Sequence, residues 1–188
     1  LSASTTSGST AVGHRALHSN TTGAGNLAIG KDALYTNTTG NYNIAIGYDA
    51  LQQNNASNNV AVGHAALHLC TTGAENTAVG RDTLYSIDSG GSNSVLGHSA
   101  GYNITSGDSN VSVGPYSGYE INTGDRNTFI GAAAGRYNGS NSNSATTTGS
   151  NNTCLGSQAV CSSSTVSNEV VLGNSSITTL RCNVQTIS

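Results

Sequence analysis

Two acidic residues have the spacing that glycoside hydrolysis could use. Retaining glycosidases place two carboxyl groups about 5 Å apart across the scissile bond. Asp32 and Asp49 stand 17 residues apart, each two residues after a glycine that closes an apolar triplet, and in a stack of strands their carboxylates would lie about 5 Å apart. Asp82 has the same place in its own unit, and Lys31 and Arg81 directly precede two of these acids. We therefore interpret the three acids as solvated turn residues beside basic partners, and we predict no enzymatic activity.

The histidines are the next candidates for chemistry, because imidazole nitrogens bind transition metals. His14 and His18, and again His64 and His68, stand four residues apart, and His98 shares the column of His14 and His64. A metal site would form if several chains brought these residues to a common axis. Duplication of a block explains the pairs without a ligand, and no Ser or Cys nucleophile motif accompanies them. We predict no catalytic residue, no metal and no cofactor.

Aromatic residues recur five places after the same glycine, where they would form a stripe along a stacked structure. Exposed aromatic rings are surfaces on which sugars stack. The structural alternative is ring packing at a corner or between chains, with the hydroxyl groups at the rim. Of the two, we favour the structural interpretation. The candidate receptor contacts are Tyr35, Tyr85, Tyr102 and Tyr119 in this column, and Tyr137, Asn138, Asn141 and Asn143 in an insertion described below.

These columns exist because the chain is built from repeats. The stretch AVGHRALH at 11–18 returns as AVGHAALH at 61–68, and a glycine closes an apolar triplet at nearly constant intervals. We call these residues the marker glycines. The intervals are 17, 17, 16, 17, 17, 17, 17, 25 and 17 residues, between Gly13, Gly30, Gly47, Gly63, Gly80, Gly97, Gly114, Gly131, Gly156 and Gly173.

Each repeat predicts one short strand that ends at the marker glycine. An aliphatic residue directly precedes every marker glycine, and a small residue such as Ala28 often stands one place earlier, so that side chains alternate between two faces. We expect the aliphatic face to form the core and the small-residue face to pack closely. The marker glycine fits a corner with positive φ or a close backbone approach. Apolar pairs such as Ala33–Leu34 predict a second strand or a corner, and a second glycine column, which includes Gly40, predicts the opposite turn.

The predicted fold class is all-β: a parallel β-solenoid or β-roll with about ten 17-residue coils. β-Branched residues, Gly and Asn fill the repeat where a helical repeat would need Leu, Glu and Lys. An asparagine stands four places before most marker glycines, and stacked amides can donate and accept hydrogen bonds along the axis. This predicted structural ladder contains Asn26, Asn43, Asn59, Asn76, Asn93, Asn110, Asn127 and Asn152.

Composition argues against several classes of protein. Charged residues make up 8% of the 188-residue chain and the net charge is −3, which argues against intrinsic disorder. Without a basic block we expect no nucleic acid partner. Without an apolar run of membrane-spanning length we expect no membrane insertion. The cysteines have neither metal-type nor disulfide-framework spacing, and the expected free thiols are Cys70, Cys154, Cys161 and Cys182.

The 25-residue interval between marker glycines contains an insertion. Its excess residues fall in RYNGSNSNSATTTGS at 136–150. Solenoids place insertions on one face, often the binding face, but a flexible and nearly uncharged segment could equally be a passive bulge. We divide the chain into a β-solenoid repeat domain over 1–177, which holds this insertion, and a C-terminal segment over 178–188.

The weak core of such a thin coil predicts association of chains. Few large apolar residues are present, and the Ala and Gly columns would leave an exposed small-residue face on each chain. Association of several chains around one axis would cover that face, so we expect an obligate oligomer.

The repeats resemble a known family. The phrases NLAIGKDAL, NIAIGYDAL, NVAVGHAAL and NTAVGRDTL are similar to the head repeats of trimeric autotransporter adhesins, which implies a homotrimer of left-handed parallel β-rolls, intertwined or side by side. The same phrasing occurs in bacteriophage tail fibres and tailspikes. The final stretch NEVVLGNSSITTLRCNVQTIS, at 168–188, resembles the segment that leads into the intramolecular chaperone of endosialidase-type phage fibres.

This second resemblance implies that a C-terminal chaperone domain assembles the trimer and then cuts itself off beside a serine, so that a matured chain would end as this one does at Ser188. It implies a structural fibre or tailspike component of a phage virion, assembled in the host cytoplasm, that attaches to a cell-surface glycan or protein receptor. The alternatives are the head of a bacterial trimeric autotransporter adhesin and, in a different class, a polysaccharide-cleaving tailspike.

Overall fold

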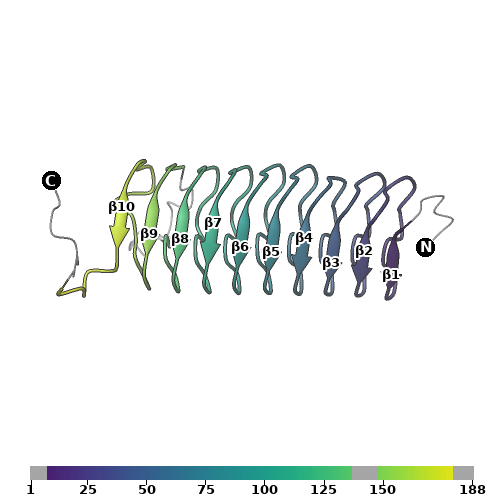
Figure 1. Cartoon of the computed structure of the whole chain (residues 1–188), viewed down its shortest axis with the longest axis horizontal. Helices are drawn as coiled ribbons and strands as arrows, with labels where there is room; N and C mark the ends of the chain where they lie inside the picture. Colours follow the sequence, from purple (N-terminus) through teal and green to yellow (C-terminus); the bar gives the residue numbers. More distant parts are fainter. Residues whose placement is uncertain (1–7, 137–147, 180–188) are drawn as a thin grey trace.

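The computed structural model describes residues 8–136 and 148–179 of the chain. They form ten three-residue strands in one parallel sheet, in which the strand order follows the sequence (Figure 1). No helix within these ranges is long and apolar enough to cross a membrane. The strands are β1 (Thr10–Val12), β2 (Leu27–Ile29), β3 (Ile44–Ile46), β4 (Val60–Val62), β5 (Thr77–Val79), β6 (Ser94–Leu96), β7 (Val111–Val113), β8 (Thr128–Ile130), β9 (Thr153–Leu155) and β10 (Val170–Leu172).

The strands pair in register along the whole sheet. Ala28 of β2 lies opposite Ala11 of β1 and Ala45 of β3, so residues one repeat apart stack on one another. The stacking continues into the turns, where the Leu34 N–H donates to the Ala50 carbonyl over 3.1 Å. One repeat is therefore one coil, and the predicted all-β parallel solenoid is confirmed.

Between the strands, the residues that the structure describes form turns and no second strand. In the first eight coils, the residues two and four places after the marker glycine have left-handed backbone angles, as at Asp32 (φ 57°) and Leu34 (φ 51°). Gly30 itself has φ 136°, and a Cβ there would collide with the carbonyl group of Gly47 in the next coil. Glycine is therefore required here both by the positive φ and by the close approach of the next coil's backbone. The apolar pair after the marker glycine thus builds a corner of the coil.

The interior of the coil is filled from two sides. The middle residue of the strand, such as Ala28 or Ala45, and the turn leucine, such as Leu34, are fully buried. The residues beside the alanine point outward, and 56% of Val12 and 50% of Leu96 are exposed. The expectation of an aliphatic core and an exposed small-residue face was wrong. Leucines from the turns occupy the narrow interior and leave room there for only a methyl group from the strand.

Residue sizes on the two walls of a coil compensate one another in several coils. Where the middle strand residue is alanine, as in β2 to β5, the facing turn residue is leucine. In β6 and β8 the middle strand residues are larger, Val95 and Phe129, and the corresponding turn residues are glycines, Gly101 and Gly135. A Cβ on Gly101 would lie 2.9 Å from a methyl group of Leu84, and one on Gly135 would collide with the Phe129 ring. At Phe129 the interior therefore has room for a large side chain from the strand but for none from the facing turn residue.

Buried asparagines join consecutive coils. The eight residues of the predicted ladder are at most 3% exposed. The Oδ1 atom accepts a backbone N–H from the next coil, as in the 2.9 Å bond from Asn110 N to Asn93 Oδ1. The Nδ2 group donates to a turn carbonyl of that coil, as from Asn93 to Gly107 O over 2.9 Å. The ladder thereby gives partners to buried backbone groups beside the sheet.

A second column of buried amides was not predicted. Asn20, Asn37 and Asn54 stand seven places after a marker glycine, and Asn37 Nδ2 donates to Asn20 Oδ1 over 3.0 Å. In later coils the buried residues Cys70 and Ile87 take this place. The same repeat position accepts amides or apolar groups, and this mixture hid the column in the sequence.

Replacement of Asn93 by alanine is expected to destabilise the protein by about 2 to 4 kcal/mol, because a buried N–H of Asn110 and a buried carbonyl of Gly107 would lose their partners. Thermal unfolding followed by circular dichroism measures the effect. Asn103→Ala is the control, because it removes the same amide from a half-exposed turn position. Equal melting temperatures for the two variants would contradict a stabilising role of the ladder.

Candidate functional site

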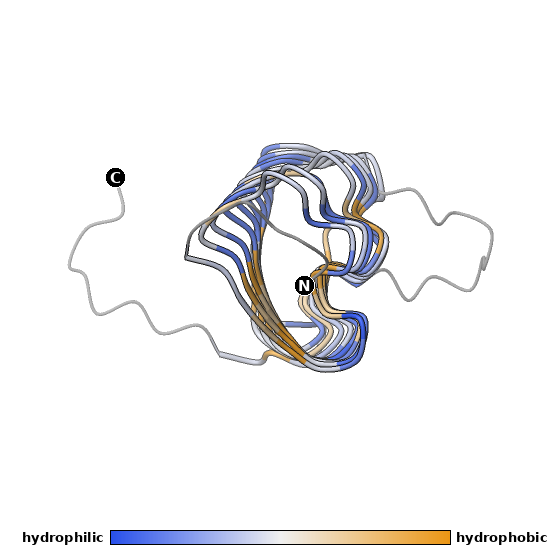
Figure 2. Ribbon diagram, turned by 90° about the vertical axis from the view of Figure 1, so that its right-hand side faces the viewer, coloured by the Kyte–Doolittle hydropathy of each residue, from blue (hydrophilic) through white to orange (hydrophobic). Residues whose placement is uncertain are grey.

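The strands carry an aliphatic face on the outer surface of the solenoid. We define it as the residues directly before the marker glycines together with Leu27, Ile44, Val60, Val111 and Val170, which stand two places earlier. Seen along the axis, the strands form a continuous hydrophobic band on one outer side of the solenoid (Figure 2). The members that are more than a third exposed are Val12, Ile29, Ile44, Leu96, Ile130, Val170 and Leu172.

The aliphatic face runs along all ten strands. Nine strand spacings correspond to a length of about 43 Å. Single apolar residues on a surface need no explanation, whereas large apolar patches on proteins are typical of surfaces that associate. This face, and not the small-residue face expected from the sequence, is the surface that a partner would cover.

The aromatic column forms a stacked ladder. Consecutive ring centroids of His68, Tyr85, Tyr102 and Tyr119 lie 5.0 to 5.2 Å apart, and the planes of each pair are within 15° of parallel. Tyr35 stacks on a histidine of the preceding coil in the same way, with 5.2 Å between the centroids. Neighbouring rings therefore cover each other's faces inside the ladder. Such a ladder presents ring edges and hydroxyl groups, and not open ring faces, along its length.

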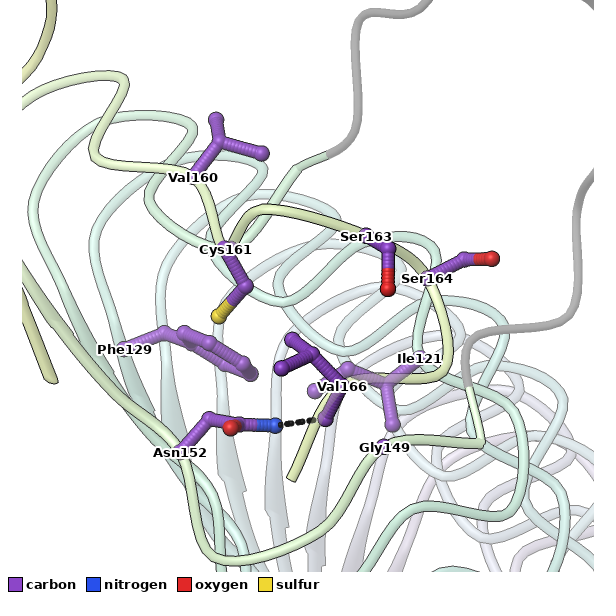
Figure 3. Close-up of a pocket in the computed structure, with 10 residues that line it drawn as sticks. Ile121, Phe129, Gly149, Asn152, Val160, Cys161, Ser163, Ser164 and Val166 are labelled. Atoms are coloured by element: carbon purple, nitrogen blue, oxygen red, sulfur yellow. Dashed lines mark hydrogen bonds between the residues drawn. The ribbon is translucent and has the colours of Figure 1, made fainter. Parts of the chain in front are cut away.

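The other candidate receptor contacts, Tyr137, Asn138, Asn141 and Asn143, lie outside the described residues. The described flank of the insertion encloses a small cavity between the last coils (Figure 3). Its volume of about 20 Å³ holds roughly one water molecule. The Asn152 amide donates to the Val166 carbonyl over 2.8 Å beside it. This cavity is too small for a sugar.

Asp32 is not the solvated turn residue expected from the sequence. Its side chain is 3% exposed and lies 2.6 Å from Arg15 Nε and 3.2 Å from Lys31 Nζ. The hydrogen bond from Arg15, with the contact to Lys31, lowers the pKa of Asp32 to about 2. The pKa values of Arg15 and Lys31 are raised in turn, by hydrogen bonds to Asp32 and to Tyr48 respectively.

This ion-pair cluster does not suit Asp32 for acid catalysis. A glycosidase acid must hold a proton near neutral pH, which requires a raised pKa. The basic neighbours of Asp32 have the opposite effect. In the pair of Asp32 and Asp49, Asp32 therefore cannot be the acid that protonates a leaving sugar.

Three of the five histidines stack on aromatic rings, and His98 meets Tyr116 edge-on. His64 lies on Tyr48 with 5.3 Å between the ring centroids, and His18 and His68 each stack on a tyrosine of the next coil. In the part of the chain that the structure describes, no three His, Cys, Asp or Glu residues are grouped so that they could hold a metal ion.

Two of the four cysteines lie close together, which their spacing did not predict. Cys154 Sγ and Cys161 Sγ are 2.9 Å apart, and both are free thiols. Cys70 is a free, buried thiol that donates to Gly73 O over 3.2 Å, and burial raises its pKa to about 12. Cys182 lies outside the described residues.

We compared the chain with known protein families, curated proteins and solved structures. No protein-family model, no curated protein and no solved structure matches this chain.

The low pKa of Asp32 makes the stability contribution of its ion pairs dependent on pH. A depressed carboxyl pKa stabilises the fold above the unfolded value of about 3.9, and this contribution is lost as the pH falls toward about 2. Asp32→Asn should therefore melt at a lower temperature than the wild type at pH 7, and the difference should shrink between pH 4 and pH 2. Melting curves across this range test the expectation, which a constant difference contradicts.

Proposed function

We propose that this chain is the shaft of a homotrimeric attachment fibre of a bacteriophage, and that its aliphatic face is buried between the three chains. The observation that carries the proposal is the aliphatic face, which has a member on each of the ten strands and exposed members on β1, β2, β3, β6, β8 and β10. The resemblance of the repeats to phage fibres and trimeric adhesins supplies the number of chains and the biological setting.

Hydrophobic free energy favours association through this face. Burying a Val, Leu or Ile side chain contributes about 1.5 to 3 kcal/mol relative to full exposure. The face contains fifteen aliphatic residues, ten before the marker glycines and five two places earlier, and seven of them are 37% to 69% exposed. Covering them would contribute on the order of 10 kcal/mol per chain, comparable with the whole stability of an ordinary domain.

The repeat architecture suits a shaft. Each added coil lengthens the solenoid by one strand spacing and leaves the cross-section unchanged. Such a rod holds a receptor-binding region away from the particle that carries it. We place receptor contact on the hydroxyl edge of the tyrosine ladder, where Tyr85, Tyr102 and Tyr119 follow one another in consecutive coils.

The mass of the protein in solution tests the trimeric shaft. The wild type is expected to have three times the 18.8 kDa mass of one chain by light scattering at micromolar concentration. Ile29→Glu combined with Ile130→Glu places charges on the aliphatic face and should reduce the mass to that of one chain. The control, Thr39→Glu combined with Thr123→Glu, adds the same charges at exposed turn positions and should leave the trimer intact. A monomeric wild type contradicts the proposal whatever the variants do.

Receptor contact is tested on a panel of immobilised bacterial capsular and O-antigen polysaccharides. We expect the wild type to bind at least one polysaccharide without releasing fragments. Tyr102→Phe keeps the stacked ring but removes the hydroxyl group, so the melting temperature should not change. The affinity for the polysaccharide should fall about tenfold, which corresponds to the loss of one good hydrogen bond. Fragment release would instead favour a polysaccharide-cleaving tailspike, and equal binding by the variant would contradict contact at this edge.

A further inference from the structure

Two thiols meet inside the coil that follows the insertion. Cys154 is the middle residue of β9 and takes the buried interior place that alanine has in β2 to β5. It is fully buried, whereas Cys161 is partly exposed at the wall of the small cavity (Figure 3). The two sulfur atoms are 2.9 Å apart.

Their meeting results from a change in the path of this coil. In earlier coils the residue four places after the marker glycine has a left-handed φ, as at Leu84 (50°) and Gly118 (60°). In this coil Gln158, two places after the marker glycine, has the usual left-handed φ (56°). Val160, four places after it, does not have a left-handed φ. Cys161, in the repeat place of the outward aromatic ladder, instead turns inward to Cys154.

The geometry needs little change to form a disulfide. A covalent S–S bond is about 2.0 Å long, so the sulfur atoms would have to approach by about 0.9 Å. Cys154 is fixed by the paired strand β9, whereas Cys161 belongs to a turn that can adjust. The neighbouring cavity gives the turn space for this adjustment.

The two thiols have different chemical roles. The hydrogen bond between the sulfur atoms, together with burial, raises the pKa of Cys154, and the same bond lowers the pKa of Cys161. The proton therefore stays on the buried sulfur, and the thiolate forms on the accessible one. The carboxylate of Glu169, which accepts the Ser162 N–H over 2.8 Å, acts against both thiolates by like charge.

We propose that Cys154 and Cys161 are a modification site at which a small-molecule disulfide of the glutathione type forms an intramolecular disulfide bond. The Cys161 thiolate attacks one sulfur of the reagent, so a mixed disulfide forms and one small thiolate leaves. Cys154 then loses its proton and attacks Cys161 Sγ, and the second small thiolate leaves. Two protein thiols are oxidised and one reagent disulfide is reduced to two thiols.

The bond closes a ring that runs from residue 154 to residue 161 and fastens the turn of this coil to its strand. Such a link removes conformational freedom from the unfolded chain. It would stabilise the solenoid next to the insertion, where the regular repeat is interrupted. An oxidising extracellular environment would form the bond, and the reducing interior of a cell would keep the thiols free.

Intact-mass spectrometry of the native protein after incubation with oxidised glutathione tests the proposal. The wild type should lose two hydrogen atoms, and alkylation in denaturant should then modify two of its four cysteines in place of all four. Peptide mapping should find Cys154 and Cys161 protected. Four alkylated cysteines, or a bond from either residue to Cys70 or Cys182, would overturn the proposal.

Single variants separate the two roles. Cys154→Ser should stop at the mixed disulfide and gain one glutathionyl group on Cys161, whereas Cys161→Ser should leave the buried Cys154 unmodified. Cys70→Ser is the matched control, because it removes a buried thiol from another coil and should still lose two hydrogen atoms. Oxidation of the wild type should also raise its melting temperature by several degrees. A loss of two hydrogen atoms in the Cys161→Ser variant would contradict the assignment.

Discussion

The structure depends on in-register parallel stacking at a fixed interval. Because Ala28 pairs with Ala11 and Ala45, every position of the repeat becomes a column along the axis. A buried polar column must then find its partners within itself or in the neighbouring backbone. Asn93 does both, since its Oδ1 accepts from the Asn110 backbone and its Nδ2 donates to the Gly107 carbonyl. The columns also place like rings over one another, which produces the tyrosine ladder.

The narrow interior is the second constraint and explains the surface. A coil that holds a turn leucine has space for only a methyl group from the strand, and Phe129 is accommodated because Gly135 faces it. The larger strand residues therefore lie outside, as Leu96 shows with half of its side chain exposed. The apolar groups that would form the core of an ordinary domain are thus placed where another chain can cover them. In this account the single chain is an incomplete folding unit.

The sequence predicted the strands, their order and the marker glycines, because all of these follow from periodicity. It could not predict which strand face points inward, since alternation defines two faces and the width of the coil chooses between them. The burial of Asp32 was missed because Arg15, its closest partner, stands one whole coil earlier. The pairing of Cys154 and Cys161 was missed for a different reason: this coil leaves the regular path after Gln158, and repeat alignment assumes that path.

The central claim, that the aliphatic face is buried between chains, is tested most directly by the reactivity of a thiol placed on it. Leu96→Cys, in a chain with Cys161→Ser and Cys182→Ser, puts a thiol at a position that is half exposed in a single chain. The account predicts that maleimide labels position 96 in the native protein at least tenfold more slowly than in the urea-unfolded chain. Native labelling at the rate of the unfolded chain would show that the face is open to water and would contradict the account.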